Sequence, residues 1–267
     1  KIRDFNYHVR GNLSWARNKI LKVTEDANIP TYKRQTGQRL GRYLGFVAEG
    51  LFQSEEEIAH SAVFEGSTDT KPGDIKLKDI NGDGQITWDQ DMVPIGRSST
   101  PEMMFGLSLG AEWKGFDFNM FWQGAAMFDV NLCGIYGSGV RDNTFYTKPF
   151  YDDGNTPYYL VENSWRPDNP NAKFPRLGIA SRENGGRFSS WWVKDGTYLR
   201  LKSLQLGYTL PKKLTEKAGF KSIRAYVSGG NLLTFCGLDY MDPEMPGVNQ
   251  GYYPQQRTYE FGLNITF

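Results

Sequence analysis

Residues 103–123 read MMFGLSLGAEWKGFDFNMFWQ, two runs in which apolar and polar side chains alternate on either side of a short turn. Alternation sustained over about ten residues predicts a strand with one apolar and one polar face. Lys114-Gly115 separates the runs and is a two-residue signal for a hairpin. The stretch therefore predicts two long antiparallel strands, 103–113 and 116–123.

The same period of two recurs in other parts of the chain. It is present in residues 5–15 and is cleanest in residues 259–267, which read YEFGLNITF. Residues 197–210 and 223–235 are predicted as further strands. The apolar phase slips between Leu201 and Leu204, so we expect a β-bulge near Ser203.

The length of these strands favours a membrane protein. Strands of about ten residues exceed the usual five or six of soluble sheets and match the roughly 9 to 11 that cross a bilayer at a tilt. No stretch approaches the roughly 18 to 20 consecutive apolar residues of a membrane helix, which excludes helical spanning. The sequence predicts an all-β fold: an incomplete, open antiparallel segment of a transmembrane β-barrel. A soluble β-sandwich with long strands remains open on the pattern alone.

Composition narrows the function further. The 31 Lys and Arg residues nearly balance 30 Asp and Glu residues, and the basic residues form no cluster, so nucleic acid is not an expected partner. The two cysteines, Cys133 and Cys236, lack CxxC spacing and are expected to be unpaired. The chain starts almost at once in an alternating strand, from which we expect it to be a piece of a longer protein.

Between the strands, the sequence predicts long loops and one short helix. Ser54 and Glu57 have the spacing of a capping box at the start of a helix over residues 54–64. Residues 136–187 are rich in Pro, Gly, Asn and Asp and are predicted to form a long extracellular loop.

Residues 79–91 carry the sharpest local motif. Oxygen-bearing side chains at positions 1, 3 and 5, followed by Gly at position 6, let a short loop curl around a hard cation such as calcium. Position 12 is Gln90 rather than an acidic residue, so the alternative is an Asx-rich turn without metal. The candidate ligands are Asp79, Asn81, Asp83, Gln85, Thr87, Asp89 and Asp91.

The sequence gives little support for catalysis. His8 and His60 are the only histidines, and no HExxH or P-loop pattern occurs. We therefore expect no enzyme, no catalytic residue and no cofactor other than calcium. Trp165, Trp191 and Trp192 are candidates for stacking on sugar rings.

Several segments resemble the SusC/RagA family of TonB-linked outer-membrane proteins. They are GDIKLKDINGDG at 73–84, FVAEGLFQS at 46–54, WRPDNPNAKFPRL at 165–177, WVKDGTYLRLKSLQLGYTLP at 192–211, AYVSGGNLLTF at 225–235 and the terminal run 259–267. Together they cover most of the chain in the family's order.

The resemblance implies that residues 1–267 are the C-terminal part of a receptor barrel of about 22 strands, without its plug and N-terminal strands. It also implies import of glycans or other bulky nutrients, including peptides, with a SusD-like surface lipoprotein and the TonB complex as partners. The expected location is the outer membrane of a Gram-negative, Bacteroidota-like bacterium, in contact with its lipid. A terminal Phe on an alternating strand is similar to the signal that the barrel-assembly machinery reads, which here comprises Tyr259, Phe261, Leu263, Ile265 and Phe267.

Two other functions remain as alternatives. The first is a soluble, secreted carbohydrate-binding module that is rich in β-structure and contains the calcium loop. It requires the apolar face of each strand to be buried. The second is a glycoside hydrolase, which requires two carboxylates about 5 to 10 Å apart.

Overall fold

The computed structural model describes residues 4–132, 158–177, 187–239, 241–245 and 255–267. The chain divides into two compact units. Unit 1 comprises residues 1–17, 101–128 and 196–267, and unit 2 comprises residues 18–100 and 129–195. Cys133 and most of the predicted loop 136–187 lie outside the described residues.

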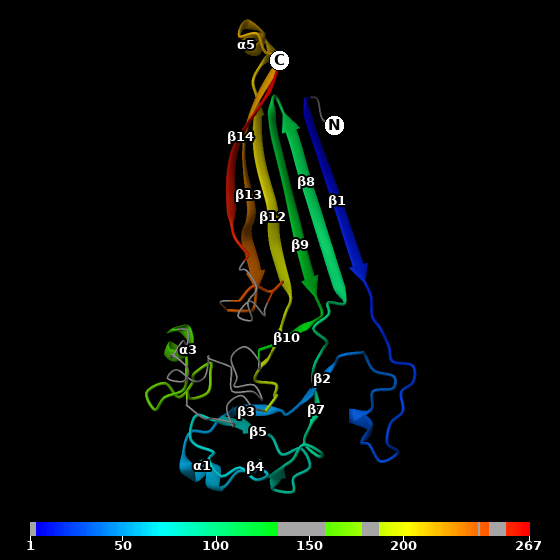
Figure 1. The fold of residues 1–267 in the computed structure, drawn as a ribbon, viewed down its shortest axis with the longest axis vertical. Helices are drawn as coiled ribbons and strands as arrows, with labels where there is room; N and C mark the ends of the chain where they lie inside the picture. The colour runs from blue at the N-terminus through cyan, green and yellow to red at the C-terminus, as the bar shows by residue number, and fades with distance from the viewer. Residues whose placement is uncertain (1–3, 133–157, 178–186, 240, 246–254) are drawn as a thin grey trace. The chain divides into compact units, whose positions relative to one another are not determined.

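Unit 1 is built on one antiparallel sheet of six long strands, which lie side by side in Figure 1. The sheet is open, with β1 and β14 at its two edges. The predicted all-β fold and its long alternating strands are therefore confirmed. In spatial order the strands are β1 (Phe5–Trp15), β8 (Met103–Trp113), β9 (Phe116–Ala126), β12 (Tyr198–Thr209), β13 (Ser222–Cys236) and β14 (Thr258–Thr266).

Connections between these strands differ strongly at the two ends of the sheet. At one end, β8 joins β9 through Lys114 and Gly115, and β12 joins β13 through a segment that holds the short helix α5 (Lys212–Lys217). At the other end the connections are residues 16–102, 127–197 and 237–257. This asymmetry is typical of outer-membrane barrels, which have short turns on one side and long loops on the other.

The predicted bulge is present. The registers of β12 with both β9 and β13 shift between Leu201 and Ser203. One extra residue, Lys202, therefore restores the alternation after the slip, so that Leu201 and Leu204 lie on the same face of the sheet.

Unit 2 contains short strands in two-stranded sheets, all antiparallel except the β4–β6 pair. Its strands are β2 (Tyr43–Gly45), β3 (Ala48–Leu51), β4 (Val63–Phe64), β5 (Ile75–Leu77), β6 (Gln85–Ile86), β7 (Val93–Gly96), β10 (Asp129–Asn131) and β11 (Val193–Asp195). Its helices are the 3-10 turn η1 (Thr31–Lys33), α1 (Glu55–Ala59) and α3 (Tyr158–Glu162). Most of the fully buried apolar residues belong to this unit, including Phe46, Ile86, Leu160 and Trp192.

Helix α1 starts where the sequence predicts and ends earlier. Ser54 is its N-cap and accepts a hydrogen bond from the amide of Glu57 at 3.1 Å. The helix stops at Ala59 because Val63 and Phe64 leave it to pair with β6 as strand β4. In the described part of the chain, no helix is long and apolar enough to cross a membrane.

Candidate functional site

The six-stranded sheet of unit 1 has one apolar face, and its register shows how that face is built. Phe5, Trp113, Phe116 and Tyr208 lie opposite one another on β1, β8, β9 and β12. The next row contains Tyr7, Ala111, Phe118, Leu206, Val227 and Phe261. Because apolar residues of neighbouring strands are paired with one another, apolar side chains run across the sheet in continuous rows.

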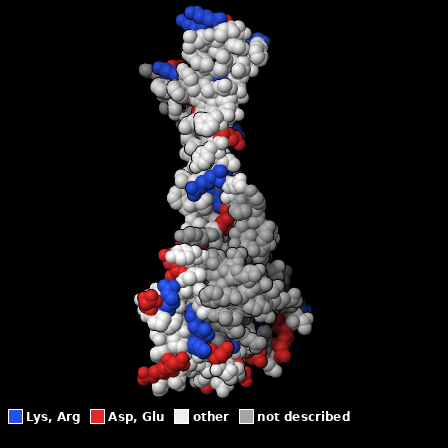
Figure 2. All heavy atoms as spheres, turned by 60° about the vertical axis from the view of Figure 1, so that its left-hand side comes forward, with Lys and Arg blue, Asp and Glu red and all other residues white. Residues whose placement is uncertain are grey.

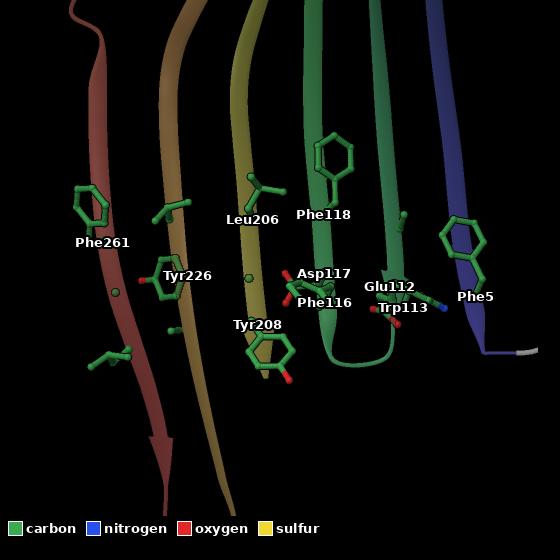
Figure 3. Close-up of a pocket in the computed structure, with 16 residues that line it drawn as sticks. Phe5, Glu112, Trp113, Phe116, Asp117, Phe118, Leu206, Tyr208, Tyr226 and Phe261 are labelled. Carbon is green, nitrogen blue, oxygen red and sulfur yellow. The ribbon is translucent and has the colours of Figure 1, made fainter. Parts of the chain in front are cut away.

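These apolar side chains are bare. Trp113 is 50% exposed and Phe261 is 85% exposed, although large apolar patches are rare on soluble monomers. An open groove of about 850 Å³ follows the rows, lined by side chains from all six strands of the sheet (Figure 3). Such a surface suits contact with hydrocarbon rather than with water.

Aromatic residues gather toward both ends of the apolar face. At the short-turn end, the rings of Phe116 and Tyr208 are 4.5 Å apart between their centroids. Toward the long-loop end, the rings of Trp122 and Phe235 stack at 6.3 Å. Two aromatic bands that flank an apolar zone are typical of a barrel that crosses a bilayer.

The opposite face of the sheet is polar. One row includes Asn6, Glu112 and Asp117 on β1, β8 and β9, and the next includes His8, Asn119 and Gln205 on β1, β9 and β12. A polar hollow of about 530 Å³ lies over part of this face.

An ion pair spans three strands on the polar face. The guanidinium of Arg224 on β13 binds the carboxylate of Asp117 on β9 through two hydrogen bonds, of 2.6 and 2.8 Å. Arg224 also donates to the amide oxygen of Gln205 at 3.1 Å. The pair crosses β12 over Gly207, where a Cβ atom would lie 2.4 Å from both side chains.

A second charged cluster lies on the polar face of β12, near its long-loop end. Arg200 is 2% exposed, and its guanidinium binds Asp242 at 2.8 Å and Glu244 at 3.1 Å. Lys202 binds the same carboxylate of Glu244 at 2.7 Å, and Thr234 accepts a hydrogen bond from Arg200. The cluster fastens residues 241–245 to the polar face of the sheet.

Sequence reasoning missed this cluster. Its signal was present, because two cations occupy the polar phase of a predicted strand and two carboxylates form the motif Asp242-Pro243-Glu244.

In unit 2, the structure joins three of the segments that carried the family resemblance. The carboxylate of Asp74 is buried and lies 2.7 Å from Nε of Arg176. Gly73 lies under the ring of Trp165, where a Cβ atom would come within 2.4 Å of the ring. Trp165 donates a hydrogen bond to Gln53. Segments 46–54, 73–84 and 165–177 therefore pack together as one cluster.

Burial is the main influence on Asp74. It raises the pKa of this carboxyl above its usual range, and the hydrogen bond and charge of Arg176 oppose that shift. The arrangement is structural: the carboxylate also accepts a hydrogen bond from the amide of Lys71.

The predicted calcium loop closes on itself through hydrogen bonds. The carboxylate of Asp79 accepts from the amides of Gly82 and Gly84, both at 2.7 Å, and these bonds lower the pKa of Asp79. The buried carboxylate of Asp91 accepts from the amides of Ile80 and Thr87, both at 2.8 Å. Asp91 therefore braces the loop from inside.

The other predicted ligands are less closely gathered. Asn81 donates to Asp83 and Gln90, while Gln85 lies in β6 and Asp89 is exposed. Among the described residues, no group of three or more His, Cys, Asp or Glu side chains is placed to hold a metal ion. Calcium binding stays a prediction.

The remaining predicted residues are placed as follows. Tyr259, Phe261, Leu263, Ile265 and Phe267 share the bare apolar face at β14, and the ring of Phe267 lies 5.3 Å from that of Phe220. Cys236 is a half-buried free thiol. Trp192 is 1% exposed, so the expectation that it stacks on a sugar is wrong.

Taken together, a bare apolar face with aromatic bands, a polar opposite face and long loops at one end define a segment of a transmembrane β-barrel wall. No protein-family model matches the sequence. Over 99% of its length, however, the chain is 30% identical to the TonB-dependent receptor P3 of Formosa agariphila. It is 22% identical over 99% of its length to the TonB-dependent receptor SusC of Bacteroides thetaiotaomicron.

A solved structure shows the same fold. The structure of the RagAB peptide transporter superposes on the whole chain with a TM-score of 0.65 and 23% identity. The chain spans 27% of receptor P3, 25% of SusC and 28% of the matching RagAB chain, about a quarter of each. The resemblance to TonB-linked outer-membrane proteins of the SusC/RagA type is confirmed.

Proposed function

We propose that this chain forms part of the barrel wall of a TonB-dependent importer in the outer membrane of a Bacteroidota-like bacterium. The observation that carries the proposal is the two-faced sheet: bare apolar rows on one side and a polar, charge-paired surface on the other. In a barrel, the first face contacts lipid and the second lines the interior. The similarity to TonB-dependent receptors supports the same function.

The cargo that we propose is a bulky nutrient, with oligosaccharides as the first class and peptides as the second. The RagAB peptide transporter, whose structure is similar to this chain, supports the second class. Import is mechanical: a SusD-like surface lipoprotein covers the long-loop side, and the TonB complex supplies the force through a plug. The function needs no catalytic residue in this chain.

Residues 259–267 have a second role in this proposal. Their exposed alternating side chains, from Tyr259 to Phe267, are the signal by which the barrel-assembly machinery recognises and inserts the chain. The exposure of β14 at an edge of the sheet supports this role, since an unpaired edge is available to a partner strand.

Cell fractionation tests the location. The protein, expressed from its own gene, should appear in the outer-membrane fraction and require detergent for extraction. Recovery in the soluble fraction would favour the secreted carbohydrate-binding module instead. That alternative needs a buried apolar face, whereas the sheet leaves this face bare.

Growth tests the transport. Deletion of the gene should abolish growth on an oligosaccharide mixture that supports the parent strain, and leave growth on the constituent monosaccharides unchanged. A defect only on peptides would select the second cargo class. Growth that is normal on all of these sources would contradict import.

A further inference from the structure

The short-turn end of unit 1 carries a concentration of lysines that the barrel itself does not use. Figure 2 shows blue side chains gathered over this end. The exposed lysines here are Lys114 in the β8–β9 turn, Lys212, Lys213 and Lys217 on α5, and Lys221 before β13.

Among the described residues, these lysines form no ion pair. None of the five forms a salt bridge with any residue that the structure describes. Glu216 is the one acidic residue on α5. Glu112 lies on the polar face opposite Asn6, and both Asp4 and Glu112 line the polar hollow that Lys114 also borders. The outer rim of this end is therefore strongly basic.

The basic rim borders directly on the apolar face. Lys114 follows Trp113 directly, and its ammonium lies 5.3 Å from the centre of the Trp113 ring, in the aromatic band. On α5, Leu214 is 57% exposed beside the lysines, whereas Thr215 is turned inward. Phe267, also bare, packs against Phe220 at the end of the same segment.

This order of side chains matches the depth profile of one leaflet. Apolar side chains contact the acyl chains, aromatic residues lie at the interface, and Lys side chains extend their ammonium groups to the headgroups. A negative membrane surface attracts basic segments of this kind, with about a fivefold gain in affinity for each lysine near the surface.

We propose that α5 and the flanking turn form a headgroup-binding collar that takes anionic phospholipid at the short-turn side of the membrane. The occupant is the lipid phosphate, because the cations are continuous with the bilayer-facing surface. The inference rests on the proposed function, in which the apolar face contacts lipid.

The test uses the complete receptor reconstituted into bilayers that contain phosphatidylcholine and phosphatidylglycerol. Brominated forms of the two lipids quench Trp fluorescence on contact, so their relative quenching gives the preference for the anionic lipid. The wild type should prefer phosphatidylglycerol. The K213Q/K217Q variant should lose about fivefold or more of that preference.

The matched control removes two exposed lysines of unit 2, as K71Q/K78Q, and should keep the wild-type preference. A second measurement needs no variant: added salt should weaken the preference of the wild type, because screening shortens the reach of exposed charges.

Equal quenching by the two lipids in the wild type would overturn the inference, and so would a preference that K213Q/K217Q or salt leaves unchanged. Equal quenching is also the result expected if the lysines serve an acidic protein instead. Failure of the receptor to enter bilayers at all would contradict the proposed function. Flotation of the vesicles measures this insertion independently of the fluorescence quenching.

Discussion

Asp117 on β9 and Arg224 on β13 meet across the intervening strand, and Gly207 on β12 provides the gap through which they reach each other. The pair is 2.6 Å apart at its closest and is mostly shielded from solvent. Its position ties three strands together on the polar face. β12 lies between the two charged residues, so a residue without a side chain is needed at position 207 for them to meet.

Replacement of Gly207 by Val tests this relationship. The new side chain would occupy the space of the carboxylate and the guanidinium, so the variant should lose about 1–3 kcal/mol of unfolding free energy. Urea unfolding of the reconstituted protein measures the loss. Gly237→Ala is the control, because a Cβ atom there meets nothing within 4 Å.

A double variant gives the sharper comparison. If Gly207→Val acts through the ion pair, its cost should shrink when Asp117 is already Ala, because the two changes remove the same interaction. Full additivity of the two costs would show that Gly207 matters for another reason.

The two faces of the sheet predict opposite responses to the same charge. Met120 lies on the apolar face and its neighbour Asn119 lies on the polar face. Met120→Lys should cost about 2–4 kcal/mol because it places a cation in hydrocarbon. Asn119→Lys should be close to neutral. Folding yield and urea stability in lipid measure both, and equal costs would contradict the assignment of the faces.

Arg200 supports a third prediction. Its replacement by Met leaves Asp242 and Glu244 without their buried partner, which should cost about 3–5 kcal/mol. Cleavage by added protease within residues 241–245 should accelerate at the same time. Neutral partners, as in R200M/D242N/E244Q, should recover much of the stability; a triple variant as unstable as R200M would refute the charge explanation.

The cap of α1 predicts a dependence on pH. Glu57 accepts hydrogen bonds from the amide of Gln53 and from Lys76, and these lower its pKa. A lowered pKa means that the folded state prefers the charged carboxylate. The stabilisation is therefore complete above the usual pKa of a Glu and is lost as the pH falls through the lowered value.

The variant E57Q measures this contribution. It should be less stable than the wild type at neutral pH, and the difference should shrink below the usual pKa of a Glu and vanish once the pH has fallen through the lowered pKa of Glu57. A difference that persists in acid would assign the effect to packing instead of charge.

Calcium titration checks the loop of residues 79–91. If the loop binds calcium, the ion should raise the melting temperature of the protein, and D79N/D83N should remove the rise. Magnesium at the same concentration serves as the control ion. An unchanged melting temperature with calcium would leave the loop as an Asx-rich turn, held by Asp79 and Asp91 through their own hydrogen bonds.

The sequence alone predicts the parts of this fold that depend on local periodicity. The long strands and the bulge near Ser203 follow from which phase is apolar. The order of the strands in the sheet cannot be predicted in this way. β9 pairs with β12 across residues 127–197, and the alternation within a strand does not show which other strand it pairs with.

The charged contacts could not be predicted from local sequence patterns either, because their partners are far apart in the sequence. Arg200 and Asp242 are 42 residues apart in sequence, and Asp74 and Arg176 are 102 apart. The short strands of unit 2 were missed because two to four residues are too few to show a period.

The bulge at Lys202 changes which positions of β12 lie on the apolar face, from odd-numbered to even-numbered residues. On the side of β12 toward Tyr198, odd-numbered residues such as Leu201 lie on the apolar face, and after Lys202 the even-numbered Leu204 and Leu206 do. A regular strand of the same sequence, without the bulge, would alternate uninterrupted through Lys202. It would move the leucines of one half of the strand to the polar face and the polar residues of that half to the apolar face, although no residue had been replaced.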